Sequence, residues 1–143
     1  MSLLLTFAFA CHMIGIFTMV GFGLTYLLRQ QFMPYHRVAL GSDWTDVPRE
    51  VQILILALMR GIAGGALAVA VLALLVLMIP FRSGEVWAFV AVPLGGLILS
   101  AGALYAMRLV AANTPAAPPY QPIVGGAVLG IIGFLLSLLD ALA

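Results

Sequence analysis

The sequence predicts an all-α membrane protein: a bundle of four transmembrane helices with the N- and C-termini on the same, outer side. Three observations support this fold class. Hydrophobic residues make up 64% of the 143 residues and charged residues 8%, whereas soluble domains carry roughly 25% charged residues. Residues 51–79 form an almost unbroken apolar run with one charge, Arg60, and about 20 apolar residues already cross a bilayer. Three further apolar runs of helical length lie before and after it.

The first predicted helix covers residues 3–28. A signal peptide is the alternative for an N-terminal apolar segment, but no Lys or Arg precedes this run. The run is also much longer than the roughly 7–15 residues of a signal-peptide core. No small-residue cleavage site follows before Arg29. We therefore expect a retained transmembrane helix.

A loop over residues 29–47 separates the first helix from the second, predicted over residues 48–79. The loop mixes arginines with aromatic residues, which is typical of the lipid headgroup level. Within it, residues 33–40 are expected to form a short helix on the membrane surface. Polar residues before Pro48 can cap the second helix, and Pro80 is predicted to end it.

The third and fourth helices are predicted over residues 86–110 and 122–142. Pro93 lies inside the third helix, where a membrane helix tolerates proline but loses one backbone hydrogen bond and bends. Several prolines between residues 113 and 122 exclude a helix there and predict an extended linker. The four helices together form a single membrane domain, residues 1–143.

The arginines predict the orientation of this domain in the membrane. Both long connections carry most of them, and only Arg82 lies in the short turn between the second and third helices. The arginines on the side of the long connections are Arg29, Arg37, Arg49 and Arg108. Because basic residues favour the cytoplasmic side, both long connections are predicted to be cytoplasmic and both termini external. A net charge of +1 argues against nucleic acid as a partner, and the lipid bilayer is the one partner that composition predicts.

Pairs of small residues four positions apart predict where the helices pack closely. Such pairs place small side chains on one helix face and let two backbones approach. They join helices either within the bundle or between copies, as in a homo-oligomer or a larger membrane complex. The pairs are Gly61 with Gly65, Gly96 with Ser100, and Gly126 with Gly130.

Arg60 is the first candidate for a functional residue. An arginine deep in the bilayer costs at least ~2.5–3.5 kcal/mol and usually faces protein or a water-filled cavity, where it would anchor an anion or a lipid headgroup. Alternatively, residues 61–79 span the membrane alone and Arg60 lies at the cytoplasmic interface. His36, Arg37 and Trp44 in the loop are further candidate anchors for a ligand or lipid.

His12 and Asp140 form a candidate polar pair within the membrane. Along ideal helices, His12 lies about 24 Å from Arg29 and Asp140 about 25 Å from Ile123, so the two side chains share a depth near the outer side. They either contact each other, or Asp140 lies in the headgroups while His12 bonds a local hydroxyl.

No metal site or cofactor is predicted. Cys11, His12 and Met13 are adjacent and point in different directions on a helix, so they cannot converge on one ion. A bis-histidine haem would need a second membrane histidine, and His36 lies in the loop on the opposite side.

The segment 35–50 holds most of the titratable groups but no recognisable catalytic motif, so no catalytic residue is predicted. One alternative is a membrane enzyme that uses His36, Asp43 and Asp46 in this loop. The other is a collar of interfacial residues whose charges pair locally and cap the second helix.

Residues 33–41 (MPYHRVALG), Trp44 and residues 51–65 (VQILILALMRGIAGG) resemble a group of small bacterial membrane proteins with four helices. The Arg-Gly-x-x-Gly-Gly piece at residues 60–65 is also similar to the corresponding helix of DoxX-like and related domain-of-unknown-function families. This resemblance implies a bacterial inner (cytoplasmic) membrane and a four-helix bundle. It implies no reaction and no catalytic residue.

Three functions therefore compete. The first is a non-enzymatic bundle that self-associates or serves as an accessory subunit of a membrane assembly. The second is binding or transport of a lipid, a quinone or a small hydrophobic ligand, with Arg60 as its polar anchor. The third is a membrane enzyme that uses the segment 35–50.

Overall fold

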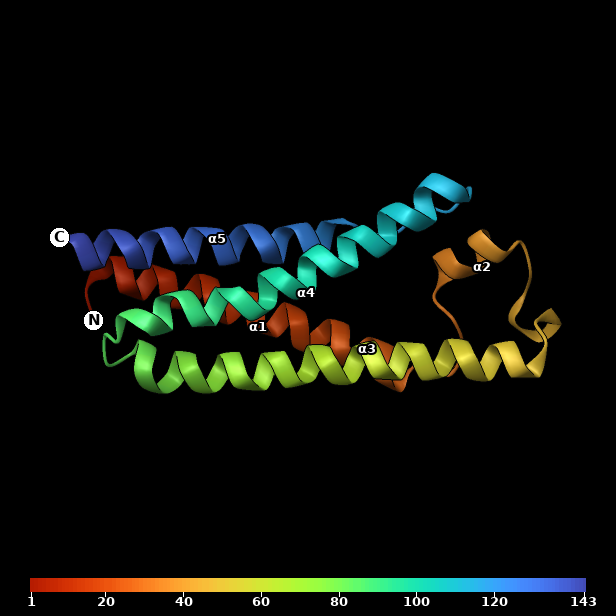
Figure 1. Cartoon of the computed structure of the whole chain (residues 1–143), viewed down its shortest axis with the longest axis horizontal. Coiled ribbons are helices and arrows are strands. Elements are labelled where there is room, and N and C mark those ends of the chain that lie inside the picture. The colour runs from red at the N-terminus through yellow and green to blue at the C-terminus, as the bar shows by residue number, and fades with distance from the viewer.

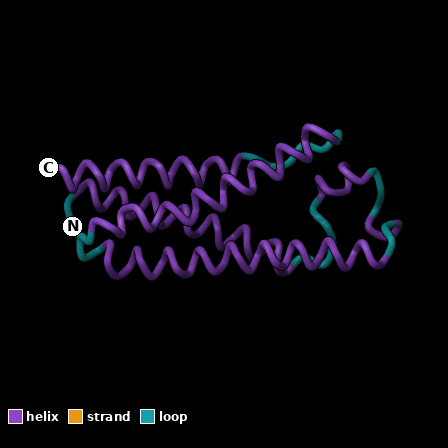
Figure 2. The backbone as a smooth tube through the Cα atoms, viewed as in Figure 1, coloured by secondary structure: helices purple, strands orange, loops and turns teal.

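The computed structural model describes all residues, 1–143, and contains α-helices without strands (Figure 1). Short loops connect the helices (Figure 2). The long helices are α1 (Leu3–Leu28), α3 (Arg49–Val76), α4 (Val86–Asn113) and α5 (Gln121–Leu142); α2 (Pro34–Leu40), a 3-10 turn (Trp44–Asp46) and a π-helical turn (Leu77–Phe81) complete the elements. The predicted all-α fold with four long helices is confirmed.

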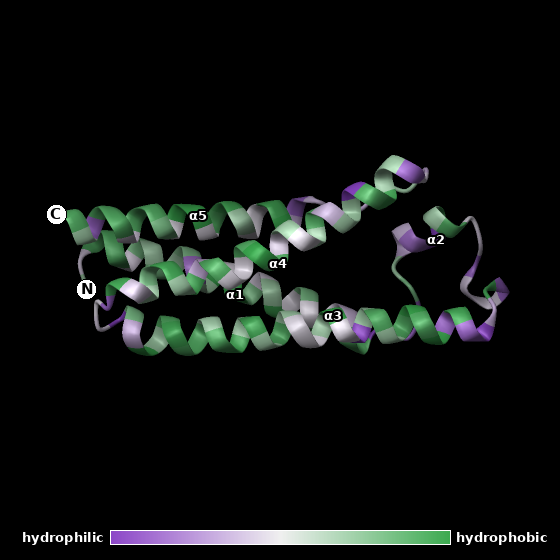
Figure 3. Ribbon diagram, viewed as in Figure 1, coloured by the Kyte–Doolittle hydropathy of each residue, from purple (hydrophilic) through white to green (hydrophobic).

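The outer surface of the bundle is apolar. Only 24 of the 143 residues are buried, and hydrophobic residues follow the four long helices while hydrophilic ones gather toward their ends (Figure 3). Each of these four helices is long and apolar enough to cross a membrane. Because a water-soluble bundle would place polar residues on this surface, the chain is a multi-pass membrane protein.

The two termini lie at the same end of the bundle (Figure 1). The Ser2 hydroxyl donates a hydrogen bond to the Asp140 carboxylate there, which ties the start of α1 to the end of α5. The same hydroxyl accepts the Leu5 N–H at 3.1 Å and caps α1. The side of the membrane that this end faces stays a prediction.

Small side chains bring α1 and α3 together. The buried face of α3 is mostly alanine at helical spacing: Ala63, Ala66, Ala70 and Ala73. Opposite them, Gly23 of α1 lies so close to Leu67 that an added Cβ would be 2.7 Å from Leu67 Cγ. Close backbone approach of this kind is how helices pack where no hydrophobic effect drives them together.

An aromatic cluster closes the bundle at the end that holds the termini. Phe81 is fully buried, and its ring centroid lies 6.4 Å from that of Phe9, 5.6 Å from His12 and 5.0 Å from Phe89. Pro80 does not end the helix as predicted, because a π-helical turn carries the chain past the proline as far as Phe81.

α4 crosses the bundle obliquely. It starts beside α3 and leans away from it toward its C-terminal end, and α2 lies in the space between the two helices (Figure 1). Pro34 occupies the first turn of α2, where a missing N–H costs nothing. Gly41 ends α2 at φ 65°, a conformation that glycine adopts without strain. We call this part of the molecule the α2 end.

The predicted small-residue pairs fall into two groups. An added Cβ would lie 3.3 Å from Met19 Cε at Gly96, 3.9 Å from Thr18 Cγ2 at Gly126 and 3.8 Å from Leu97 Cδ2 at Gly130, so these positions lie at helix contacts. Ser100 is half-buried beside them. Gly61 and Gly65 have no atom within 4 Å of an added Cβ and take no part in packing within the chain.

Candidate functional site

A cavity of about 710 Å³ opens at the α2 end. We call it the α2 groove. This volume lies within the roughly 300–1,000 Å³ of small-molecule sites. Fifteen of its 17 lining residues are hydrophobic, and the two exceptions are His36 and Gly102. His36 is therefore the only titratable acidic or basic side chain among the lining residues apart from the tyrosines. Its long walls come from α3 (Ile55, Leu58, Met59, Ile62) and from α4 (Ile98, Leu99, Gly102, Ala103, Ala106, Met107, Val110).

One end of the α2 groove is polar. The hydroxyl oxygens of Tyr26 and Tyr35 lie 2.9 Å apart and share a hydrogen bond. Tyr26 is buried and packs on Phe22, with ring centroids 4.4 Å apart. Tyr35 packs edge-on against His36, with ring centroids 4.2 Å apart. α1 and α2 thus place two hydroxyl groups and one imidazole together at the edge of an apolar cavity.

The protonation states of these groups follow from their surroundings. Burial lowers the pKa of His36, and the positive charge of Arg29 lowers it further, so the imidazole is neutral at pH 7. Its Nδ1 accepts the Met33 N–H at 3.3 Å, so the ring proton of the neutral form lies on Nε2 and can be donated to a ligand. Burial, followed by the contact with Tyr26, raises the pKa of Tyr35, which therefore keeps its proton.

Arg29 lies next to this polar end. It follows the last residue of α1, and its Nε donates to the Phe32 carbonyl oxygen at 3.3 Å. This bond holds the half-buried side chain back over the loop. No carboxylate lies within ion-pair distance of its guanidinium, because the one ion pair in the chain joins Arg37 and Asp43.

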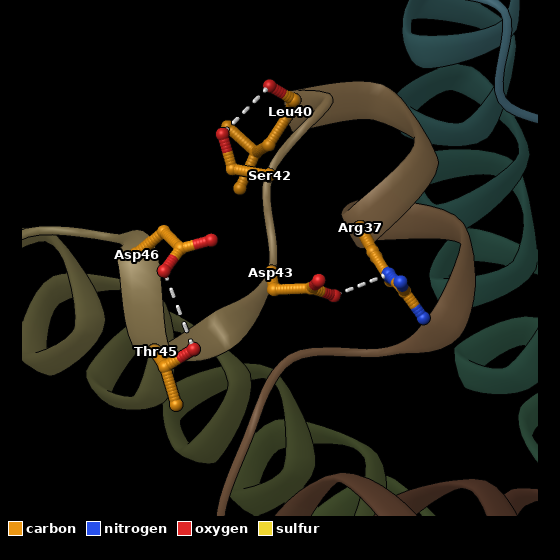
Figure 4. A network of polar contacts seen from close by, with 6 residues as sticks. All are labelled: Arg37, Leu40, Ser42, Asp43, Thr45 and Asp46. Atoms are coloured by element: carbon orange, nitrogen blue, oxygen red, sulfur yellow. Dashed lines mark hydrogen bonds and ion pairs between the residues drawn. The ribbon is translucent and has the colours of Figure 1, made fainter.

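Of the predicted loop anchors, only His36 lines the α2 groove. Arg37 Nε forms an ion pair with Asp43 Oδ1 at 2.6 Å on the surface (Figure 4). Trp44 packs edge-on against Phe32 at 5.0 Å between centroids, and its carbonyl oxygen accepts a hydrogen bond from Gln52 at 2.7 Å. Arg37 and Trp44 thus shape the loop and do not contribute to the cavity.

The structure does not bring the three loop residues of the enzyme hypothesis together. Asp43 pairs with Arg37, and Asp46 accepts a hydrogen bond from Thr45 at 3.4 Å (Figure 4). His36 is bonded to Met33 instead. No hydrogen bond joins His36 to either aspartate.

Arg60 does not face the bundle interior, and it does not line the α2 groove. Its side chain is exposed on the outer face of α3. Arg82 follows it by 22 positions, about 33 Å along a helix, close to the ≈ 30 Å of a hydrocarbon core. Glu85 and Arg108 have nearly the same spacing along α4. This spacing favours the interfacial alternative for Arg60, with the first turns of α3 beyond the hydrocarbon.

The predicted contact between His12 and Asp140 is absent. Asp140 bonds Ser2, whereas His12 is buried against Phe81 and against Gly133, about two turns of α5 before Asp140. An added Cβ at Gly133 would lie 2.6 Å from His12 Cε1. His12 Nε2 has no hydrogen-bond partner, so the structure does not show the alternative bond from this nitrogen to a local hydroxyl.

Sequence reasoning missed Tyr26 and the lining residues of α4. Tyr26 lies in an apolar run, three positions before Arg29, and a tyrosine at a membrane-helix end is the signal that was present. The α4 wall carried no signal, because its apolar residues look like any lipid-facing helix.

Comparison of the chain with protein families, with curated proteins and with solved structures gives no match. The resemblance to DoxX-like proteins stays a prediction.

Proposed function

We propose that this multi-pass membrane protein binds a lipid or another small hydrophobic molecule in the α2 groove. The observation that carries the proposal is the cavity of about 710 Å³ with apolar walls and one polar end. Transfer of apolar surface out of water contributes roughly 25 cal/mol per Å², so an apolar molecule of matching shape is stabilised there.

The arrangement of the polar groups indicates an amphiphile. Tyr35 and His36 lie on α2, outside the membrane-spanning helices, and the apolar walls extend from them toward Ile62 and Ile98. A molecule with its polar head at α2 and its hydrocarbon part along the walls has the same orientation as a lipid of that leaflet. Because most arginines lie in the long connections, we propose that the α2 end faces the cytoplasm. The family resemblance implies that the membrane is a bacterial inner membrane.

A substitution that fills the cavity tests the proposal. Gly102 lines the α2 groove, and an added Cβ there meets no atom within 4 Å, so the side chain of Gly102→Leu can start there without strain and occupy part of the cavity. Gly64→Leu on α3 is the matched control, because Gly64 is equally free of contacts but does not line the cavity.

Native mass spectrometry after purification in lipid nanodiscs gives the readout. We expect wild type and Gly64→Leu to retain one lipid or hydrophobic molecule per chain, and Gly102→Leu to lose it. Equal retention by all three proteins would show that the groove is not a binding site.

A second candidate is a bundle that self-associates or joins a larger membrane assembly. It is favoured by an unpacked face of α3, where Gly61, Gly64 and Gly65 point outward next to Arg60. Small residues on a lipid-facing helix allow close approach of a second helix. Sizing of wild type and Gly61→Leu in a mild detergent tests this candidate; a monomer in both cases excludes self-association.

A further inference from the structure

The polar end of the α2 groove offers hydrogen-bond donors and no negative charge. His36 Nε2 carries a proton because Nδ1 accepts the Met33 N–H. Tyr26 and Tyr35 share one hydrogen bond, so one of their two hydroxyl protons remains available. No aspartate or glutamate is among the lining residues.

Arg29 adds a positive charge to this end. Its charge is close enough to His36 to lower the pKa of the imidazole. Nε is engaged with the Phe32 carbonyl oxygen, which leaves the two terminal nitrogens without an ion-pair partner. Guanidinium groups bind carboxylate and phosphate oxygens through parallel hydrogen bonds, which are stronger than hydrogen bonds between neutral groups.

From this charge complementarity we propose that the ligand of the α2 groove is an anionic amphiphile, with a carboxylate or phosphate head at Arg29, Tyr35 and His36 and its hydrocarbon chain along α3 and α4. This inference rests on the proposed function. A neutral or cationic head would leave the charge of Arg29 uncompensated in a half-buried position, whereas an oxyanion compensates it and accepts the free donors.

The position of Arg29 fits such a head. It follows the last turn of α1, where the apolar membrane-spanning segment ends, so the head lies at headgroup level while the chain extends toward the bilayer interior. Arg29 is not itself a lining residue, but it lies close to the lining residue His36, whose pKa its charge lowers. Arg60 and Arg108 are exposed and line no part of the groove. They serve as charge-matched controls at the same end of the bundle.

Binding of three single-chain probes to the full-length protein in detergent tests the inference. The probes are palmitate, palmitoyl lysophosphatidate and the neutral monopalmitoylglycerol, compared in wild type, Arg29→Gln, Arg29→Lys and Arg108→Gln. We expect at least tenfold tighter binding of an anionic probe than of the neutral one in wild type. Arg29→Gln should remove that advantage without changing affinity for monopalmitoylglycerol, which also shows that the fold survives.

Arg29→Lys should keep part of the advantage, because it keeps the charge but loses the two-pronged geometry, and Arg108→Gln should bind like wild type. Comparison of the two anionic probes tells carboxylate from phosphate, and a clear preference for either supports the inference. If charged and neutral probes bound equally and Arg29→Gln changed nothing, the proposal of an anionic ligand head would be wrong, while the groove would remain a binding site. The proposed function itself would be overturned if wild type bound none of the probes and if wild type and Gly102→Leu retained the same amount of bound molecule in native mass spectrometry.

Discussion

The hydroxyl oxygens of Tyr26 and Tyr35 lie 2.9 Å apart, and their hydrogen bond connects the membrane-spanning helix α1 to the short helix α2. Tyr26 is buried at 6% exposure, so its hydroxyl has little access to water. α2 therefore stays over the cavity partly because each tyrosine satisfies the other.

Removal of this hydrogen bond should loosen α2. Tyr26→Phe or Tyr35→Phe is expected to cost about 1 kcal/mol of unfolding free energy, the usual net value of such a bond. Because each substitution already breaks the same bond, the double variant should cost little more than one of them. A double-mutant cycle by denaturant unfolding in detergent measures this; fully additive costs would show that the two hydroxyls do not interact in solution.

The pKa of His36 should lie below 6.5, and its titration by NMR in detergent checks this value. Burial is the main cause and the charge of Arg29 the second. Arg29→Gln should therefore raise the pKa only part of the way toward 6.5. A pKa of His36 at or above 6.5 in wild type would contradict the buried position of the ring.

The same shift gives stability a pH dependence. Between the lowered folded-state pKa and 6.5, the unfolded chain binds more protons than the folded protein, so the free energy of unfolding rises with pH in this window. The contribution of His36 is fully present above pH 6.5 and is lost as the pH falls through the window. His36→Gln should flatten this part of the curve, as measured by thermal unfolding from pH 7.5 to 5.

Gly133→Ala should destabilise the bundle by about 1–3 kcal/mol, the range for overpacked sites. Its Cβ would lie 2.6–2.9 Å from three ring atoms of His12. Gly125→Ala on the same helix meets no atom within 4 Å and should be neutral or slightly stabilising. In a His12→Ala background the cost of Gly133→Ala should vanish; if it persisted there, the clash with the ring would not be its cause.

Arg60→Leu should leave both the fold and the α2 groove unchanged. Arg60 is exposed and lines no cavity, so unfolding free energy is expected to stay within about 0.5 kcal/mol of wild type. Retention of a bound molecule, followed by native mass spectrometry, should also match wild type. Loss of that molecule would support the alternative in which Arg60 is the polar anchor of the ligand.

Hydropathy alone was sufficient to predict the four long helices. A membrane-spanning helix satisfies its own backbone hydrogen bonds within one segment. Its position can therefore be predicted from one continuous apolar stretch, such as residues 51–79. The short helix α2 was also predictable, because Pro34 and Gly41 mark its two ends. The end of α3 was misplaced because the effect of Pro80 depends on a π-helical turn, which has no sequence signature.

Most of the candidate site could not be predicted from the sequence. His36 was identified, but the sequence left open whether Arg60 is buried or lies at the membrane interface, because a run of apolar residues does not say which face of a helix meets lipid. The pairing of His12 with Asp140 failed for a related reason: depth can be counted along a helix, whereas the rotation that turns His12 toward Gly133 depends on packing. The groove lies between α3 and α4, in the part of the molecule where α4 leans away from α3 (Figure 1).

The unequal lengths of the spanning helices affect how the protein adapts to bilayers of different thickness. The helical segment Arg49–Phe81 has 33 residues and α5 has 22, which correspond to about 50 Å and 33 Å. A thicker membrane can cover further turns of the longer segment, but α5 has no apolar turns in reserve. Hydrophobic mismatch therefore acts on α5 first, and with it on the Ser2–Asp140 contact that holds its last turn against the start of α1.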